Sequence, residues 1–521
     1  MAAVIPSRLR GLVFFLLLAP LAIAFAWQDE LATFSDDSVS YLTLAHYFAG
    51  TNVFAAEWAG YHSNFPPLFP LLLALTGGVT NLHVAYVGIA LCAAGGVALF
   101  YRYAAAQIGE RGALVVALLF LCSATAWVSL KGVLSEPLYL LMSMAALQYH
   151  DSRIATRRDS ARGWEWLLFG LLLAAACLSR VIGFFLVGAY LAHVIFGSIG
   201  QRKKPRAAAW LPLAPVVALF GLWQWVRPRV DFDAYAFATR AIAGDWIAAP
   251  GAQLAKSWQI FGDAWIRLFV ADHDVGMATK IVFAIVGVVA IAGAIRRARQ
   301  NRLDGWYALF TVAFVMAWPI VADNSRRLLY PVLPVLILQA ALLVRAVLDR
   351  PALKIQTRIA VTAVAAALPL LLCLPALALI AHKSLDRRVI VEGCPNEFRE
   401  VAEYYTRLSY AVAADAANSE GIMLCGLRAI DRIAPPDAVV MWMRPEYIAI
   451  LGKRKAVAYR FDWTPERLAA EIRRLNVSFL VVSDIGKTDY AGMWGPALSA
   501  APNAQPVLVM PGGVFFIERV R

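Results

Sequence analysis

Apolar runs about twenty residues long recur along most of this chain, and no other feature limits its fold so strongly. Of its 521 residues, 60% are hydrophobic and only 16% are charged, a balance that soluble globular proteins do not have. The sequence therefore predicts a polytopic α-helical membrane protein. Eleven membrane spans are expected, near residues 11–27, 82–101, 112–129, 133–149, 164–179, 183–198, 208–226, 277–295, 305–322, 328–347 and 359–381.

The basic residues predict the orientation of the chain. If the N-terminus lies in the cytoplasm, every connector on that side is basic, as the positive-inside rule requires. These connectors are residues 102–111, 153–162, 202–206, 296–302 and 345–358. Because the basic residues cluster there, the formal net charge of +13 indicates contact with membrane lipids and not with nucleic acid. The two long connectors, 28–81 and 227–276, then lie on the exterior side.

The pattern changes near residue 383, where the apolar runs become short. We expect residues 1–382 to form the membrane domain and residues 383–521 an exterior α/β domain. Cys394 and Cys425 are the two cysteines outside the predicted spans. If the domain is exported they either pair in a disulfide or remain free thiols. Its predicted strands are 437–443, 456–461, 477–483, 507–510 and 514–518, and its predicted helices are 445–451 and 464–475.

An acidic stretch, residues 34–70, follows the first span and contains no Lys or Arg. It opens with Asp36 and Asp37. Capping of a helix by Ser35 or Asp36 would put Asp37 in the first helical turn, one turn before Tyr41. Capping explains one carboxylate, but not an adjacent pair in a long connector without basic residues. A carboxylate at a dry membrane edge can instead act as a general base toward a hydroxyl or amine.

Four further ionisable residues are expected on the same side as Asp37. Glu136 opens a predicted span, where a carboxylate also favours a helix N-terminus. Arg180, Arg326 and Arg327 violate the positive-inside trend. Either they snorkel to lipid headgroups or they bind a phosphate group, for which guanidinium is suited. Exterior acids beside exterior arginines describe a site for a lipid phosphate and for an acceptor that loses a proton.

The second long exterior connector carries two features whose interpretation stays open. Residues 254–268 have aromatic and aliphatic side chains at helical spacing, typical of a helix at headgroup level or of a gate for a lipid substrate. The run from Asp272 to Asp274 either binds a divalent metal or is solvated. No set of metal ligands is assigned.

Five short motifs, in this order, resemble those of the GT-C superfamily of polytopic glycosyltransferases. The resemblance is to the bacterial relatives of protein O-mannosyltransferases and of the lipid A aminoarabinose transferase. The motifs are Asp37 to Tyr41, Phe65 to Leu68, Ser135 to Leu138, Leu178 to Arg180, and Arg326 to Pro331. The first acidic pair of this family is often Asp-Glu, so which of Asp36 and Asp37 is the base stays open.

The resemblance implies an inverting hexosyl- or pentosyltransferase of the bacterial inner membrane with a periplasmic C-terminal domain. Its donor would be a polyprenyl-phosphate sugar, and its acceptor a lipid, a glycan or a protein. Of the two acids, Asp37 is favoured as the base because its spacing to Tyr41 matches the motif, and Asp36 would assist it. The remaining substrate-binding residues would be Tyr41, Glu136, Arg180, Arg326 and Arg327. A non-enzymatic lipid or glycan transporter is the alternative, although such carriers commonly show internal repeats and charges near the membrane midplane.

Overall fold

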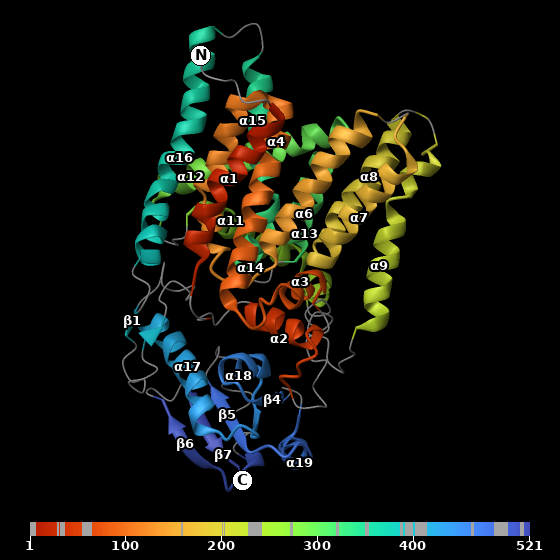
Figure 1. Ribbon diagram of the computed structural model, residues 1–521. Coiled ribbons are helices and arrows are strands. Elements are labelled where there is room, and N and C mark those ends of the chain that lie inside the picture. Colours follow the sequence, from red (N-terminus) through yellow and green to blue (C-terminus); the bar gives the residue numbers. More distant parts are fainter. Residues whose placement is uncertain are drawn as a thin grey trace.

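The structure is a computed structural model, and it consists of a helical part and a smaller sheet domain (Figure 1). It describes residues 7–28, 31, 37–54, 65–157, 160–200, 202, 204–227, 242–270, 275–318, 322–349, 354–385, 389–390, 400–401, 414–459, 463–483, 499–510 and 515–520. Asp36, Cys394 and the run from Asp272 to Asp274 lie outside these residues.

The helical part contains long apolar helices packed side by side, with short helices at their ends (Figure 1). The first group of helices in the chain is α1 (Ser7–Ala26), α2 (Ser38–Phe48) and α3 (Leu68–Thr76). The next group is α4 (Leu82–Leu121), α5 (Ala124–Val128), α6 (Glu136–Tyr149), the π-helical turn η2 (His150–Ala155), α7 (Gly163–Ser179), α8 (Gly183–Gly200), η3 (Ala207–Trp210) and α9 (Leu213–Val226). The last group is α11 (Pro250–Phe269), α12 (Met277–Arg299), α13 (Leu303–Ala317), α14 (Ala322–Leu329), η4 (Tyr330–Val332), α15 (Leu333–Leu348) and α16 (Ile355–Leu385).

Seven helices in the described residues are long and apolar enough to cross a membrane, so the predicted count of eleven spans is not confirmed. One reason is Gly109, whose φ of 77° interrupts α4 between two of the predicted spans. Another is helix length, because α7 and α13 have only 17 and 15 residues. A helix rises about 1.5 Å per residue, so helices of this length are short for a bilayer core about 30 Å thick.

Small residues allow the helices of the bundle to approach closely. Gly293 of α12 packs against the backbone of Gln339 in α15, where an added Cβ would lie 2.3 Å from the Gln339 carbonyl oxygen. Gly170 of α7 packs in the same way against Pro212. Such contacts are important in membranes, where close packing replaces the hydrophobic effect between helices.

The sheet domain has a five-stranded mixed sheet whose strand order is β4-β3-β5-β7-β6. β3 pairs in parallel with β4 and β5, whereas β7 pairs antiparallel with β5 and β6. The elements are β1 (Val389–Ile390), β2 (Glu400–Val401), α17 (Ala414–Ile433), β3 (Val439–Met441), α18 (Pro445–Leu451), β4 (Lys455–Val457), α19 (Pro465–Arg474), β5 (Phe479–Ser483), β6 (Gln505–Val509) and β7 (Phe515–Arg519).

The five strands of the main sheet and the helices α18 and α19 overlap the predicted segments, whereas α17, β1 and β2 were not predicted. Helix α18 has the predicted bounds, and β6 and β7 form the predicted terminal hairpin. Cys425 in α17 is disulfide-bonded. The domain boundary near residue 383 and the exterior location of the domain stay predictions.

The sheet domain contacts the segment around α2 in the helical part. Helix α18 packs against α2. Phe54, which follows α2, forms a parallel β-bridge with Ala456 in β4. The Lys455 ammonium donates a hydrogen bond to the carbonyl oxygen of Asn52. The sheet domain therefore lies beside the segment that begins with Asp37.

Gly293→Ala is expected to lower the unfolding temperature of the full chain in detergent, because the new methyl group would overlap the Gln339 backbone. Overpacking of this kind costs about 1–3 kcal/mol. Gly221→Ala in α9 is the control, since nothing lies within 4 Å of the added Cβ. It should raise stability by about 0.5–1 kcal/mol, because alanine favours a helix. Equal shifts in the two variants would contradict the close packing of α12 on α15.

Candidate active site

Asp37 lies at the start of α2, but not where the sequence places it. The helix begins at Ser38, so Asp37 occupies the position before the first turn. Its side chain makes no capping hydrogen bond. Instead, Asp37 Oδ2 accepts a hydrogen bond of 2.8 Å from Arg327 Nη2. Pairing with a guanidinium has replaced the local cap, because it offsets the cost of removing a carboxylate from water.

Glu136 is the first residue of α6, and its side chain is only 1% exposed. Two arginines hold it: Arg180 Nη1 lies 2.6 Å from Oε2, and Arg327 Nε donates to Oε1 over 2.7 Å. A buried carboxylate needs such partners, because its desolvation alone costs several kcal/mol. The position at a helix N-terminus adds further stabilisation. Asp37, Arg327, Glu136 and Arg180 thus form one continuous ion network.

Tyr41 connects α2 to the turn before α6. Its hydroxyl lies 2.7 Å from the hydroxyl oxygen of Ser135, and burial raises its pKa, so the phenol stays neutral. One turn earlier, Ser38 Oγ accepts a hydrogen bond from the backbone N–H of Val133. The ring of Tyr41 packs edge-on against Phe65. These contacts fix the start of α2 against the start of α6.

Arg180 lies in the sharp turn between α7 and α8. Its backbone is extended, and its carbonyl oxygen accepts a hydrogen bond of 2.9 Å from the N–H of Gly183. An added Cβ at Gly183 would lie 2.5 Å from the backbone of Ala176 and Cys177. Only glycine therefore allows α8 to start so close to the end of α7. This turn places the Arg180 guanidinium beside Glu136.

The two neighbouring arginines of α14 contact different groups. Arg327 joins the ion network, whereas Arg326 Nη1 donates to Thr125 Oγ1 in α5 over 3.1 Å. Consecutive residues of a helix point in directions about 100° apart, so both side chains cannot face one ligand. The sequence groups the two arginines, and the structure separates them.

A cavity of about 530 Å³ opens beside the ion network. Its lining includes Asp37, Tyr41, Arg180 and Arg327. Aromatic side chains from α8, α9 and α13, with Trp318 just after α13, also line it. They are Phe184, Phe185, Phe220, Trp223, Phe314 and Trp318. The volume lies within the range of about 300–1,000 Å³ typical of ligand pockets. The lining of the cavity therefore combines charged groups with aromatic side chains.

Of the predicted site residues, the structure brings five together and separates one. Asp37, Tyr41, Arg180 and Arg327 line the cavity, and Glu136 holds the two arginines. Arg326 does not line it, and Asp36 lies outside the described residues. Their roles in a reaction stay predictions.

Sequence reasoning missed three polar residues of the cavity lining. They are Gln224 in α9, Arg227 just after α9, and Asn324 in α14. Arg227 carried a usable signal, since it is another arginine at the predicted exterior edge of a span. Gln224 and Asn324 carried none, because a lone amide in an apolar run or in a short connector is ordinary.

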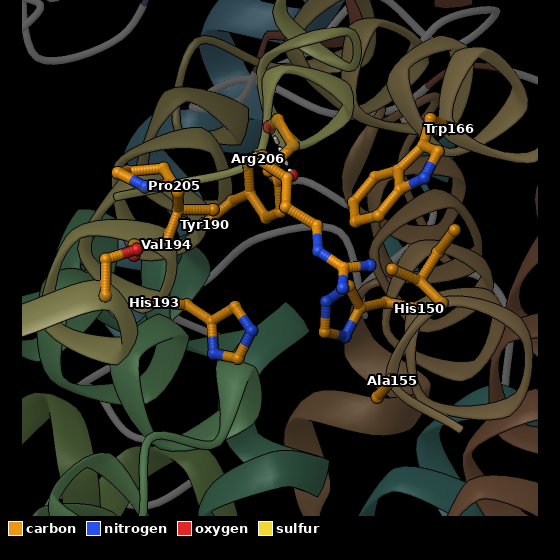
Figure 2. Close-up of a pocket in the computed structure, with 11 residues that line it drawn as sticks. His150, Ala155, Trp166, Tyr190, His193, Val194, Pro205 and Arg206 are labelled. Atoms are coloured by element: carbon orange, nitrogen blue, oxygen red, sulfur yellow. Dashed lines mark hydrogen bonds between the residues drawn. The ribbon is translucent and has the colours of Figure 1, made fainter. Parts of the chain in front are cut away.

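A second cavity lies near the other end of α6 (Figure 2). Figure 2 shows His150, His193 and Arg206 pointing toward a shared space, with Trp166 at its edge. The rings of His150 and His193 are 5.0 Å apart. The volume is only about 40 Å³. A water molecule needs about 10–15 Å³ on this measure, so the space holds a few waters and no sugar.

The described residues contain no cluster of three or more His, Cys, Asp or Glu residues that could hold a metal ion. In the ion network, both carboxylates contact guanidinium groups instead. The predicted metal run from Asp272 to Asp274 lies outside the described residues.

Solved structures show what this arrangement of helices is. The chain is similar to ArnT, the lipid A aminoarabinose transferase, from Cupriavidus metallidurans bound to undecaprenyl phosphate, with a TM-score of 0.55, 13% identity and 98% of each chain covered. ArnT in the apo state gives a TM-score of 0.53 at 12% identity over 99% of each chain. The Archaeoglobus fulgidus oligosaccharyltransferase in complex with Zn and sulfate gives 0.56 at 12% identity, over 96% of this chain and 72% of that chain.

These similarities show the fold. The chain has the GT-C fold, as the sequence predicts, with a small C-terminal sheet domain. No protein-family model matches the chain, and no curated protein matches it in sequence. At 12–13% identity the neighbours assign no activity to it.

Arg327→Ala is expected to lower the free energy of unfolding by about 3–5 kcal/mol, because it removes one partner of a buried carboxylate. Arg345→Ala is the matched control: Arg345 is 56% exposed and pairs with the exposed Asp349 at 3.5 Å. Such surface pairs contribute less than about 1 kcal/mol. Denaturant or thermal unfolding in detergent measures both variants. If the two losses were equal, Glu136 would not depend on Arg327.

Proposed function

We propose that this protein is a glycosyltransferase of the bacterial inner membrane that takes a sugar from a polyprenyl-phosphate donor. The reaction would occur at the periplasmic face, where the charge pattern of the sequence locates Asp37 and the sheet domain. The observation that carries the proposal is the cavity whose lining holds Arg180, Arg327 and Asp37 together with aromatic side chains. A ligand with a phosphate group and a hydrocarbon chain suits a cavity lined by both charged and apolar groups.

Arg180 and Arg327 would bind the donor phosphate. Arg180 Nη1 contacts Glu136 and Ser135, but its Nε and Nη2 have no partner among the described residues. Both arginines are oriented by Glu136, so a phosphate would meet donors that are already in place. Arg326 is assigned no phosphate contact, because it hydrogen-bonds to Thr125 and does not line the cavity.

Asp37 would accept the proton of the acceptor. Arg327 occupies Oδ2, while Oδ1 has no partner among the described residues and Asp37 lines the cavity. As the acceptor oxygen or nitrogen bonds to the anomeric carbon, its proton passes to Asp37. The bond from that carbon to the phosphate oxygen breaks, and its electron pair stays on the lipid phosphate. Attack opposite the leaving phosphate inverts the anomeric configuration.

The polyprenyl chain would lie along the aromatic side chains that line the cavity. Phe185 and Phe314 are 4.3 Å apart between ring centres, and Phe184 and Phe220 are 4.7 Å apart. These pairs join α8 to α13 and α8 to α9, so the aromatic lining extends across three helices that would offer a hydrocarbon chain an apolar surface. Burial of an alkyl chain against these aromatic rings would be favourable by about 0.8 kcal/mol for each CH₂ group removed from water.

Asp37→Asn is expected to reduce sugar transfer by at least about 100-fold, the usual contribution of a general base. The assay uses membranes that contain the full chain and undecaprenyl-phosphate donors carrying a radiolabelled hexose or pentose. Arg180→Gln should lower the rate by about 100- to 1,000-fold, because it removes charge stabilisation of the leaving phosphate.

Asp263→Asn is the matched control, since its carboxylate is 59% exposed on α11, outside the cavity. It should leave transfer within about twofold of the wild-type rate, as surface substitutions usually have small effects. Undiminished transfer by Asp37→Asn would refute the assignment of the base. Movement of label across the membrane without a new glycosidic bond would instead support a carrier.

A further inference from the structure

A cavity of about 640 Å³ lies at the far end of α6 from Glu136, between η2 and the start of α7. It has no part in the proposed sugar transfer. It is lined by Tyr149, Arg153, Arg157, Ser160, Arg162, Trp164, Glu165 and Leu168. Helix α6 and η2 together run from Glu136 to Ala155, and twenty residues of helix span about 30 Å, the thickness of a bilayer core. The two cavities therefore lie at opposite faces of the membrane.

The lining places three guanidinium groups around one space. Tyr149 and Arg153 are four residues apart on α6 and η2, Arg157 lies in the turn after η2, and Arg162 precedes α7. Among the described residues, none of these arginine side chains forms an ion pair with a carboxylate. Glu165 adds one carboxylate, but its Oε2 accepts the backbone N–H of Arg162 at 2.8 Å. Positive charge therefore dominates the cavity.

Tyr149 gives a second, independent observation that points to a ligand. Its hydroxyl oxygen is buried and has no hydrogen-bond partner in the described residues, although the residue lines the cavity. An unsatisfied buried hydroxyl costs about 1–3 kcal/mol. A phosphate oxygen in the cavity would remove this cost by accepting the hydroxyl proton.

Apolar side chains beside the arginines favour a lipid over a soluble anion as the ligand of this cavity. Trp164 is 56% exposed and Leu168 is 37% exposed beside the arginines. Leu167 and Leu171 on the same helix are 42% and 47% exposed. Tryptophan is enriched at the headgroup level of membranes, and leucines below it face acyl chains. The cavity thus offers cations for a headgroup next to a surface for its hydrocarbon chains.

We propose that this cavity binds the phosphate headgroup of an anionic membrane lipid in the leaflet opposite the active site. The guanidinium groups of Arg153, Arg157 and Arg162 contact the phosphate oxygens, and Tyr149 donates a hydrogen bond to one of them. The acyl chains pass Trp164 and Leu168 into the bilayer. The usual role of basic connectors, to set orientation by charge alone, requires neither a cavity nor an aligned tyrosine hydroxyl.

The test measures the affinity of the full chain in detergent for phosphatidylglycerol and for phosphatidylcholine by native mass spectrometry. Arg153→Gln, Arg157→Gln and Arg162→Gln are combined in one variant. It should bind phosphatidylglycerol at least about tenfold more weakly than wild type, since each basic residue near an anionic lipid contributes about fivefold. Phosphatidylcholine binding should be unchanged.

The control removes the same charge from the same end of the bundle. Arg111, Arg296 and Arg299 are exposed and line none of the cavities described above. Their combined change to Gln should weaken phosphatidylglycerol binding by less than about threefold, because it lowers only the long-range attraction. Equal losses in the two triple variants would overturn the proposal.

Tyr149→Phe keeps the shape of the site and tests it without the risk of unfolding. It should leave the unfolding temperature unchanged or higher, since it deletes an unsatisfied hydroxyl, and yet weaken phosphatidylglycerol binding several-fold. Unchanged affinity would contradict the hydrogen bond to phosphate. Displacement of the lipid by millimolar inorganic phosphate would show that the site takes a soluble anion and would overturn the lipid assignment.

Discussion

The buried carboxylate of Glu136 is the constraint on which the rest of the site depends. At 1% exposure it has lost its water, and two guanidinium groups at 2.6 and 2.7 Å replace that water. One of them comes from the turn between α7 and α8 and the other from α14, so a single charge joins three parts of the chain. Arg327 then reaches Asp37 and adds α2 to the assembly. The charges that build the fold at this end also contribute to the lining of the cavity.

This origin explains which parts of the site were predictable. Asp37, Glu136, Arg180 and Arg327 stood out because each breaks a membrane rule, either by lying at a dry edge or by placing positive charge on the exterior side. Arg326 breaks the same rule and was grouped with them. Only the direction of its side chain, toward Thr125, separates it from Arg327. The direction of each side chain depends on the rotation of α14 about its axis, and a short polar segment has no apolar pattern from which that rotation could be predicted.

The prediction of the fold was correct for the same kind of feature, a large and simple energetic cost. It was incomplete where the structure depends on packing. Hydropathy located the apolar segments because the cost of exposing polar backbone to lipid is large and simple. It did not yield a confirmed number of spans, since a break such as Gly109 and short helices such as α13 depend on packing. In the sheet domain, short apolar runs predicted the strands. The bridge between Phe54 and Ala456, some four hundred residues apart, left no local signal.

Helix α2 is held on both sides, and this has a consequence for Asp37. Before its first turn, Asp37 pairs with Arg327, and along its length the helix packs against α18 of the sheet domain. Tyr41 and Ser38 fix the same turn to the residues just before Glu136. A shift of the sheet domain relative to the bundle must therefore either bend α2 or move Asp37 against the arginines. Because three polar contacts resist that movement, the carboxylate is positioned in advance, as its proposed role as a base would require.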